Sequence, residues 1–387
     1  MRVVHVITRL IVGGAQENTV STVLGLLQKP DTEVELLSGP SEGPEGSMES
    51  VFDRHPGVLK HIPDLVRPVH PLKDLNCLRH LARCFRENRP DIVHTHSGKA
   101  GILGRLAAKR AGVPIIIHTI HGPSFGPFQG ALANLIFTTA EKIAARHTTH
   151  FISVAQAMTN QYLDAGIGTP ERYSRIFSGF RLEPFLQAEN DLSLRRRLGL
   201  KETDVVIGKI ARLFELKGHD DLFAIAPSLI SHNPNIKFLF VGDGILRPKF
   251  EAQARDLGLK EHFVFTGLVP PSEVPRYVGI MDFLVHLSRR EGLPRALPQA
   301  LAAARPVIAY DCDGAPEICL DDQTGFLVPL GDHQLLLEKI LLLARDAALR
   351  QRLGLHGQEF VRENFAEQRM VDSIFDLYHR LLKPLPK

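Results

Sequence analysis

Three features that would narrow the function of a protein are scarce or missing in this sequence. The 387 residues include only four cysteines, with no CxxC pair and no framework of close spacings, so we expect buried, reduced thiols in a cytosolic protein. The net charge of +3 is too small to indicate nucleic acid as a partner. No apolar run approaches the ~20 residues that a membrane span needs. His5 and Arg9 interrupt the apolar N-terminal strand, which makes it a poor signal peptide.

The composition that is present is typical of a soluble globular protein. Hydrophobic residues make up 44% of the chain and charged residues 23%, and the length suffices for two domains of ordinary size. Apolar strands alternate with helices in two successive series, first five or six strands and then six. This pattern predicts an α/β fold with two doubly wound domains. We expect the first domain at 1–180, a linker at Ser178 to Phe185, and the second domain at 185–365.

The most informative stretch runs from Ser288 to Asp332 and is typical of a loop, a helix, a buried strand, a glycine loop and a strand. Glu291 stands in an E-G-L-P loop directly after an apolar strand. A helix from near Leu297 to Ala304 would point its free N–H groups back at that loop, and these groups with the helix dipole favour an anion such as phosphate. The stretch therefore predicts a ligand site at the carboxyl edge of a parallel sheet.

Two other loops follow predicted strands and suit phosphate. Arg212 and Lys217 lie five positions apart. The planar guanidinium group of arginine and the compact ammonium group of lysine together suit a pyrophosphate, although solvated surface cations would give the same pattern. Gly13 and Gly14 precede a helix, where glycine allows close approach to a ligand, although a plain tight turn is the alternative. No G-x-G-x-x-G fingerprint occurs, and Arg247 stands where its third glycine would be, which argues against a nicotinamide cofactor.

Histidines stand at the ends of two predicted strands of the first domain. His94 and His96 share one face of a strand, but no third ligand is close in sequence, so we expect no metal there. His121 follows an apolar strand in the sequence His-Gly-Pro and would lie at the carboxyl edge of the sheet. It would either face a ligand or only cap the sheet. His118 lies on the strand itself, and we expect it to pack in the interior.

These motifs together resemble the donor-site signature of retaining glycosyltransferases of family 4, which have the GT-B fold. Glu291 holds the acidic place of the E-G-x-P loop, and a small-residue helix, P-V-I-A and G-x-x-E…G-x-L-V follow in the same order. Gln299 departs from the signature, which has a second glutamate there. In the N-terminal half, D-x-V-H-x-H and a strand ending in H-G also match. The resemblance implies two Rossmann-like domains that face each other across a cleft, with a C-terminal helix, 366–387, packed back onto the first.

The resemblance also implies a role for each candidate residue. Glu291 and His121 would be catalytic, with Glu291 on the sugar hydroxyls near the anomeric centre and His121 approaching the sugar from the other domain. Arg212 and Lys217 would hold the pyrophosphate, and Gln299 would hydrogen-bond the ribose. The remaining substrate-binding residues would border the donor, in part through their backbone: Gly13, Gly14, Leu268, Gly292 and Leu293.

We expect neither a metal nor a cofactor other than the donor itself. Asp311 and Asp313 formally make a D-x-D pair, with which glycosyltransferases of the GT-A fold hold a divalent metal. Here the pair follows the fifth strand of a second domain, which is the wrong context for such a site.

The function expected from the resemblance is retaining, metal-independent transfer of a hexose from a nucleotide-diphosphate sugar to a glycan or lipid-linked acceptor in cell-surface polysaccharide synthesis. A sugar-nucleotide epimerase of the same fold and a catalytically silent sugar-nucleotide or glycan-binding protein are the alternatives. Arg79, Arg83, Arg86 and Arg89 recur along one predicted helical face. They make either a solvated face or a basic strip that touches anionic lipid, at the inner face of the plasma membrane.

Overall fold

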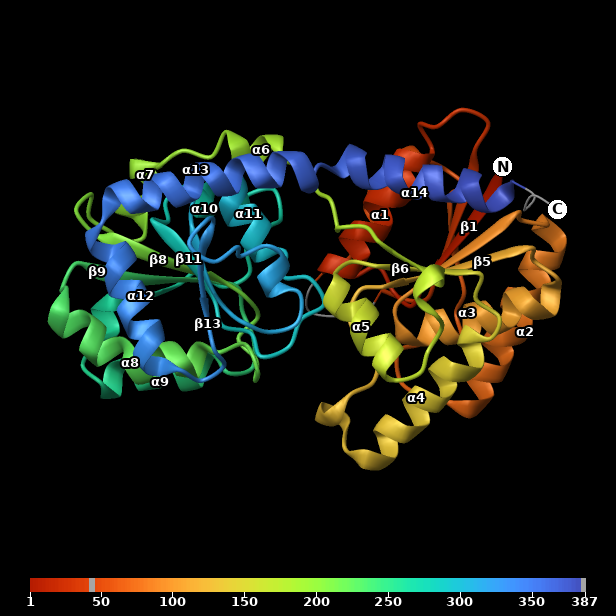
Figure 1. Ribbon diagram of the computed structural model, residues 1–387, viewed down its shortest axis with the longest axis horizontal. Helices are drawn as coiled ribbons and strands as arrows, with labels where there is room; N and C mark the ends of the chain where they lie inside the picture. The colour runs from red at the N-terminus through yellow and green to blue at the C-terminus, as the bar shows by residue number, and fades with distance from the viewer. Residues whose placement is uncertain (42–45, 384–387) are drawn as a thin grey trace. The chain divides into compact units, whose positions relative to one another are not determined.

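The computed structural model describes residues 1–41 and 46–383 and divides the chain into two compact units. The first unit comprises Met1–Phe180 and the segment from Glu367, and the second comprises Arg181–Ala366 (Figure 1). Residues 42–45, in the loop predicted at 39–46, and residues 384–387, at the end of the predicted C-terminal segment, lie outside the described residues.

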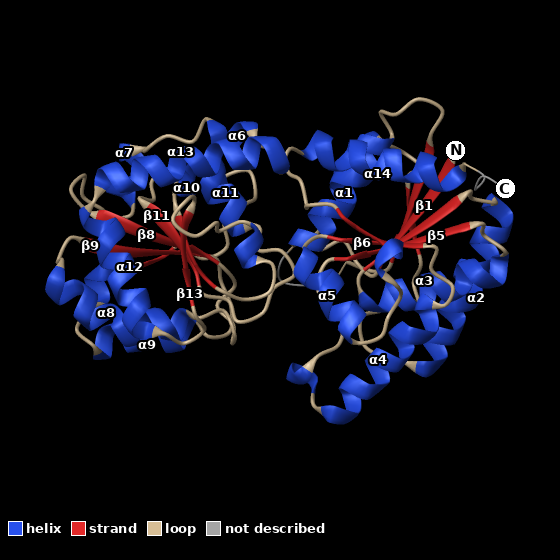
Figure 2. Ribbon diagram, in the orientation of Figure 1, coloured by secondary structure: helices blue, strands red, loops and turns tan. Residues whose placement is uncertain are grey.

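The first unit is built on a seven-stranded parallel sheet in the order β3-β2-β1-β4-β5-β6-β7. Its central strands are buried along nearly their whole length, as expected for a parallel sheet that helices cover on both faces, although they carry several buried histidines (Figure 2). The strands are β1 (Arg2–Ile7), β2 (Glu33–Ser38), β3 (Leu59–His61), β4 (Ile92–His96), β5 (Ile115–Ile120), β6 (His150–Ser153) and β7 (Tyr173–Arg175).

The helices of the first unit pack on the two faces of this sheet in separate apolar clusters. One cluster joins the sheet to α1 and α14, and the other joins it to α2 and α3. The helices are α1 (Gly14–Leu26), α2 (Pro71–Asn88), α3 (Gly98–Ala111), α4 (Ala131–Ala145), α5 (Gln156–Asp164) and α14 (Glu367–Leu382), with 3₁₀ turns at Glu49–Arg54, Pro127–Gln129 and Pro170–Arg172.

The C-terminal helix α14 lies beside α1, so the two ends of the described chain meet in one unit (Figure 1). Its apolar stripe is buried through Met370, Val371, Ile374, Leu377 and Tyr378. The contact is close: a Cβ added to Gly25 of α1 would lie 2.5 Å from a methyl carbon of Val371.

The second unit contains a six-stranded parallel sheet in the order β10-β9-β8-β11-β12-β13. Phenylalanine rings from strands and helices stack in its core. The strands are β8 (Val205–Ile210), β9 (Ile236–Val241), β10 (Phe263–Phe265), β11 (Phe283–His286), β12 (Val307–Tyr310) and β13 (Gly325–Val328). The helices are α6 (Glu183–Leu186), α7 (Leu192–Arg197), α8 (His219–His232), α9 (Arg247–Asp256), α10 (Val274–Gly279), α11 (Ala296–Ala302), α12 (His333–Arg345) and α13 (Ala347–Asn364), with 3₁₀ turns at Lys260–His262 and Ala315–Glu317.

The structure corrects three details of the sequence-based expectation. The first sheet has seven described strands rather than five or six, because β3, only Leu59–His61, carries no apolar run that would reveal it. Arg89 lies beyond the end of α2 in a left-handed conformation, so the helical strip contains three arginines rather than four. The short helix α11 ends at Ala302, two residues before the predicted end at Ala304.

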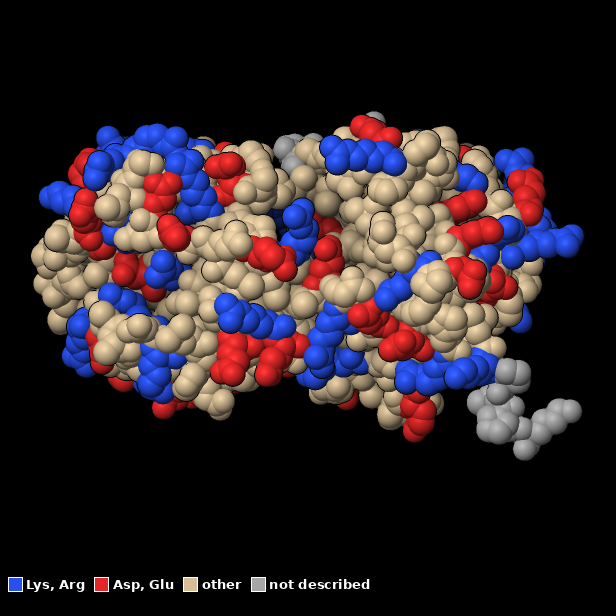
Figure 3. All heavy atoms as spheres, turned by 90° about the horizontal axis from the view of Figure 1, so that it is seen from above, with Lys and Arg blue, Asp and Glu red and all other residues tan. Residues whose placement is uncertain are grey.

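Charges of both signs are spread over the molecule. On the face drawn in Figure 3, lysine and arginine side chains alternate with aspartate and glutamate across both units, in keeping with a net charge of only +3. No helix among the described residues is long and apolar enough to cross a membrane.

Candidate functional site

The second sheet reverses its strand order between β8 and β11, which lie side by side with Leu284 opposite Gly208. Strands on one side of this point follow one another outward through β9 and β10, and those on the other side through β12 and β13. The chain therefore leaves β8 towards one side of the sheet and β11 towards the other, and the carboxyl ends of these two strands mark the switch point. Ligands of open α/β sheets bind at such a switch point.

The loop after β8 carries Arg212 and Lys217 and is held close to the end of β11 by Gly218. This glycine has a φ of +65°, and a Cβ there would lie 2.1 Å from the carbonyl oxygen of Leu287, so only glycine fits. Gly218 also precedes the first residue of α8. Arg212 is exposed beside the ring of Phe214, and Lys217 is partly buried at the helix N-terminus. Lys217 thus stands where an anion would meet the free N–H groups of α8, and Arg212 lies on the same loop.

Glu291 lies in the loop after β11 and forms an ion pair with Lys217. Its side chain is 27% exposed, and His286 at the end of β11 lies 3.8 Å from the same carboxylate. Burial is the largest single effect on Glu291 and would raise its pKa, but the charge of Lys217, the neighbouring His286 and hydrogen bonds from Lys217 and Ser288 together outweigh it, so the pKa lies below its usual value. Glu291 is therefore a carboxylate at neutral pH, able to accept hydrogen bonds from hydroxyl groups.

Asp313 supports this loop from the neighbouring strand. Its carboxylate accepts a 2.7 Å hydrogen bond from the backbone N–H of Glu291, and Asp313 itself adopts a positive φ of 51° after β12. The sequence pattern presented Asp313 only as half of a D-x-D pair. Its contact with the Glu291 loop was missed because it depends on how two loops meet, and the sequence carries no signal for that.

The other predicted donor-site residues of the second unit lie around the same sheet edge. Gly292 and Leu293 are buried between Glu291 and α11, and Gln299 is half-buried on α11. Leu268 follows β10 at the far side of the sheet and is 58% exposed. The structure thus brings Lys217 and Glu291 into contact, whereas Leu268 lies three strands away from β11.

A buried polar layer that the sequence analysis did not single out lies beneath the ion pair. Lys209 of β8 is 1% exposed, and among the described residues its Nζ has no hydrogen-bond partner. Burial, and next the charge of Lys217, lower its pKa to about 7. Burial also lowers the pKa of His219 to about 2 and that of His286 to about 3, so both imidazoles are neutral.

In the first sheet the strand order reverses between β1 and β4, and candidate residues follow β1 and β5. Gly13 precedes α1 and Gly14 is its first residue, so both lie at a helix N-terminus at the sheet edge. His121 directly follows β5 and is partly buried. The structure thus places these three residues at the carboxyl edge of the sheet of their own unit.

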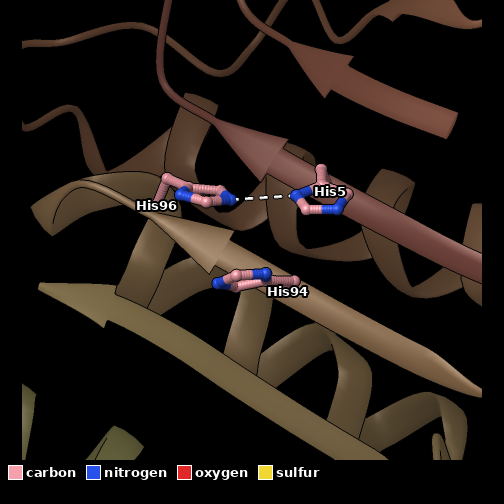
Figure 4. A group of neighbouring side chains, drawn as sticks. All are labelled: His5, His94 and His96. Carbon is pink, nitrogen blue, oxygen red and sulfur yellow. Dashed lines mark hydrogen bonds between the residues drawn. The ribbon is translucent and has the colours of Figure 1, made fainter. Parts of the chain in front are cut away.

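His121 is joined to a buried histidine cluster (Figure 4). His94 and His96 do share a face of β4, and His5 of β1 completes the group, with ring nitrogens of the three within 4.8 Å of one another. The sequence analysis missed His5 as the third histidine because the cluster forms only when β1 pairs with β4, some 90 positions along the chain. His118, predicted to pack, is 2% exposed and bonds Thr95 on the opposite face.

Comparison with known proteins then decides the family. Residues 12–183 match the family described as Glycosyltransferase Family 4, and residues 191–360 match Glycosyl transferases group 1. The chain is 30% identical over 322 residues to the UDP-Gal:alpha-D-GlcNAc-diphosphoundecaprenol alpha-1,3-galactosyltransferase of Escherichia coli, with 82% of each chain covered. The chain belongs to the group 1 glycosyltransferases of family 4.

A further relative and a solved structure agree with this family assignment. The capsular polysaccharide biosynthesis glycosyltransferase CapM of Staphylococcus aureus is 25% identical, with 92% of each chain covered. Among solved structures, HepE of Anabaena in complex with UDP superposes with a TM-score of 0.81 at 21% identity, covering 98% of this chain and 100% of that one. The two parallel Rossmann-like sheets of this glycosyltransferase are therefore those of the GT-B fold.

Proposed function

We propose that this glycosyltransferase transfers a hexose from a nucleotide-diphosphate sugar to a glycan or lipid-linked acceptor in cell-surface polysaccharide synthesis, with retention of the anomeric configuration. The observation that carries the proposal is the Lys217–Glu291 ion pair at the β8–β11 switch point. The ammonium group of Lys217 suits a phosphate, and the carboxylate of Glu291 suits sugar hydroxyls. The pair lies at the edge where α/β sheets bind ligands.

Each residue of the second unit has a role in this proposal. Arg212 and Lys217 bind the diphosphate and neutralise the charge that develops on it as the glycosidic bond breaks. Glu291, ionised because Lys217 holds its pKa below the usual value, accepts hydrogen bonds from hydroxyl groups of the transferred sugar. Gln299 hydrogen-bonds the ribose, while the backbone of Gly292 and Leu293 and the segment at Leu268 border the donor.

In the first unit, Gly13 and Gly14 border the donor at the N-terminus of α1, and His121 contacts the reacting sugar. An imidazole can donate one hydrogen bond and accept another, which suits the hydroxyl groups of a sugar. Gly13 has an extended backbone conformation that any residue can adopt. In this proposal a glycine is needed there because a side chain would take up the space of the donor.

The relatives support the choice of substrates. The name of the E. coli relative specifies a UDP-linked galactose donor and a lipid diphosphate acceptor, and that of the S. aureus relative specifies capsular polysaccharide. A mycobacterial relative, 28% identical over 71% of this chain, is named for a GDP-mannose donor and a phosphatidylinositol mannoside acceptor. A nucleotide-diphosphate sugar is named for two of these relatives, and all three names refer to a lipid-linked substrate or to polysaccharide synthesis.

We further propose that transfer needs no divalent metal. The charge that a metal would offset is met by Arg212 and Lys217. Asp313, the better placed acid of the D-x-D pair, already accepts a hydrogen bond from the Glu291 backbone. In the part of the chain that the structure describes, the only group of three side chains close enough to hold an ion is the histidine cluster of the first unit.

Contact with an anionic membrane is the last element of the proposal, and α2 and α4 support it. Exposed apolar side chains line α4, with Leu132 72%, Leu135 64% and Ile136 56% exposed. Arg79, Arg83 and Arg86 line an open hollow on α2, and both helices pack against α3. Exposed apolar side chains that enter the lipid boundary and arginines that meet phosphate head groups are the two features by which helices bind an anionic lipid surface.

Vesicle binding tests the membrane contact. Sedimentation with vesicles that contain phosphatidylglycerol should carry the protein down, and vesicles of phosphatidylcholine alone should carry less. Leu132→Ser with Ile136→Ser should abolish the difference, whereas Leu355→Ser, an exposed leucine of α13 in the other unit, should not. Equal sedimentation of native protein and the α4 variant would exclude α4 as the contact.

Transfer itself is tested by incubating the protein with a panel of nucleotide-diphosphate sugars and a short lipid-linked acceptor. The product should be a glycoside with the anomeric configuration of the donor, seen in the coupling of the anomeric proton by NMR. An inverted product, or free sugar with no glycoside, would contradict the proposed function. A protein that binds donor but never transfers would instead be the silent binding protein that Gln299 suggests.

A further inference from the structure

The histidine cluster of the first unit forms a continuous path of hydrogen bonds from α14 to His121. Nδ1 of His5 lies 3.0 Å from Nε2 of His96, and Nδ1 of His96 lies 3.1 Å from Nε2 of His121. At the buried end, the hydroxyl of Tyr378 bonds Nδ1 of His94 and lies 3.5 Å from Nε2 of His5. Figure 4 shows the His5–His96 link, with His94 beside it on β4.

The burial of His5, His94 and His96 leaves each of these three imidazoles with a single proton. His5, His94, His96 and Tyr378 are all 0% exposed. Burial lowers the pKa of His5 to about 3, and burial together with the neighbouring histidines lowers the pKa values of His94 and His96 well below the usual value. A neutral imidazole carries a proton on one nitrogen and a lone pair on the other.

This restriction couples the tautomers of the linked rings. A hydrogen bond between two ring nitrogens needs one N–H and one bare nitrogen. Because each link in the path joins an Nδ1 to an Nε2, His5 and His96 must carry their protons on the same nitrogen, and a neutral His121 must match them, so that all three are protonated on Nδ1 or all three on Nε2. Any mixed arrangement sets two protons or two lone pairs against each other at about 3 Å, within normal hydrogen-bond distance.

Tyr378 decides between the two arrangements. Its bond to His94 is much shorter than its contact with His5. A phenol is a stronger hydrogen-bond donor than an imidazole N–H, and a bare imidazole nitrogen is a stronger acceptor than a phenol oxygen. The Tyr378 hydroxyl therefore donates to Nδ1 of His94, and its oxygen is left to accept from Nε2 of His5. His94 then donates from Nε2 to the hydroxyl of Thr119, 2.6 Å away.

We propose that Tyr378, His5 and His96 form a relay that fixes the proton of His121 on Nε2 and so makes its Nδ1 a hydrogen-bond acceptor. The ligand served by that acceptor, a sugar hydroxyl, rests on the proposed function, whereas the relay itself does not. Tyr378, His5 and His96 act as positioning residues, since they reach the sugar only through His121. The sequence separation is large: Tyr378 comes from the C-terminal helix and His5 from the first strand.

A metal ion is the competing occupant of this cluster. Zinc bound by three histidines needs three bare nitrogens at ~2.0–2.1 Å from one point. Here Nδ1 of His5 and Nε2 of His96 point at each other, and both nitrogens of His94 are bonded to hydroxyl groups. The three ligands bring no negative charge to a fully buried site, so the hydrogen-bonded relay accounts for their positions better.

The test is the ¹⁵N spectrum of the imidazoles at neutral pH, with each ring assigned through its own His→Gln variant. The relay predicts that His5, His94, His96 and His121 all carry the proton on Nε2. His5 and His96 in opposite tautomers, or His121 protonated on Nδ1, would overturn it. One equivalent of zinc in the purified protein, removable with loss of melting temperature, would replace it with a metal site. These readouts need no transfer activity, so a protein inactive on every donor would sink the proposed function and leave the relay standing.

A variant adds a second readout. Tyr378→Phe removes one hydroxyl, and the Nδ1–H form of His121 should then appear in the spectrum while kcat falls several-fold. Tyr173→Phe is the matched control, because it removes a hydroxyl that bonds the carbonyl of Ile167 in the same unit but outside the relay. It should lower the melting temperature comparably and leave the His121 tautomer and kcat unchanged. A His121 tautomer that is the same in both variants would exclude Tyr378 as its determinant.

Discussion

At the scale of single residues, the ion pair of Lys217 and Glu291 is the most informative contact in the structure. Both side chains are partly buried, 18% and 27% exposed, so neither partner can be removed without leaving the other desolvated and unpaired. In a donor complex, Lys217 would stand between the diphosphate and the carboxylate. The pair would therefore orient Lys217 for the proposed diphosphate, and it helps to keep Glu291 ionised.

We expect Arg212→Ala and Lys217→Ala each to weaken nucleotide-diphosphate binding by ~1.5–3 kcal/mol, the usual value of hydrogen bonds to charged groups. Titration calorimetry on each variant measures this. Arg255→Ala and Lys249→Ala on α9 are matched controls that change the same charges on the exposed surface of the same unit. If the α9 variants lose as much affinity, the effect is one of net charge, and direct binding of the diphosphate by Arg212 and Lys217 is wrong.

Glu291 and Gln299 should respond differently to exchange of carboxylate and amide. Gln299→Glu should keep the turnover rate within about tenfold, a barrier change below ~1.4 kcal/mol, because it alters donor binding more than chemistry. Glu291→Gln should reduce transfer far more, because the amide lacks the negative charge that pairs with Lys217 and presents N–H groups to the sugar where the carboxylate only accepts hydrogen bonds. Initial rates on one accepted donor compare the two. Activity in Gln299→Glu alone would mean that the native chain is a binding protein.

The sequence predicted which residues lie at the sheet edges more reliably than which residues touch. Arg212, Lys217 and Glu291 could be placed because each follows an apolar strand, and the strand ends of a parallel sheet meet at one edge. The hydrogen bond from Glu291 to Asp313 and the third histidine, His5, could not. They depend on loop conformation and on the pairing of strands far apart in the chain.

At the scale of elements, β8 combines an apolar pattern with one buried cation. Lys209 occupies a core position of a central strand, next to the end that carries Arg212. Its pKa of about 7 means that burial destabilises the charged form. A buried, charged lysine lowers the stability of the folded state. Lys209 is also close enough to Lys217, Asp221 and Glu291 to feel their charges, so it belongs to the surroundings of the candidate donor site.

The lowered pKa of Lys209 determines whether the free energy of unfolding rises or falls with pH. In the unfolded chain the lysine keeps its proton to about 10.4, whereas the folded protein loses it above about 7. The unfolded state therefore binds more protons between these values, and the free energy of unfolding should rise with pH there, by at most ~1.4 kcal/mol per pH unit. Below pH 7 both states are protonated and the full penalty applies.

Lys209→Met should remove this dependence. We expect the variant to be more stable than the native protein at pH 7 and to approach it as the pH rises towards 10, because the methionine fills the site without a charge. Urea unfolding at a series of pH values gives the difference directly, and other titrating groups cancel in it. A constant difference across this range would show that Lys209 does not titrate there.

The sequence also defined long elements better than short ones. The C-terminal helix was expected at 366–387, and α14 covers Glu367–Leu382 with five apolar side chains buried at helical spacing along it. Strand β3 was not expected, because its three residues, Leu59–His61, are partly or largely exposed and become a strand only by pairing with β2. The sequence pattern reveals helices and strands that bury a whole apolar face. Short edge strands form only through pairing with a neighbouring strand, so the pattern does not reveal them.

At the scale of the whole molecule, the chain passes between the two units twice, after Phe180 and before Glu367. Each unit keeps its own core and its own sheet switch point, and each carries part of the predicted chemistry: Gly13, Gly14 and His121 in the first, Arg212, Lys217 and Glu291 in the second. The C-terminal helix returns to the first unit and brings Tyr378 to the histidine cluster.

Removal of divalent metal should leave the activity intact. Transfer in excess chelator should proceed at the rate seen with added magnesium or manganese, because protein cations offset the charge of the leaving nucleotide diphosphate. Initial rates with and without chelator, on the same donor, make the comparison. Activity that vanishes with chelator and returns with manganese would revive Asp311 and Asp313 as metal ligands.

The central claim is that the β8–β11 switch point holds a nucleotide-diphosphate sugar. The melting temperature of the native protein and of the double variant Arg212→Ala/Lys217→Ala, each with a panel of such sugars, tests it most directly, since a ligand that binds only the folded state raises the melting temperature. We expect at least one sugar to stabilise the native protein and to lose most of that effect in the double variant. Equal stabilisation of both proteins, or of neither by any sugar, would contradict the claim.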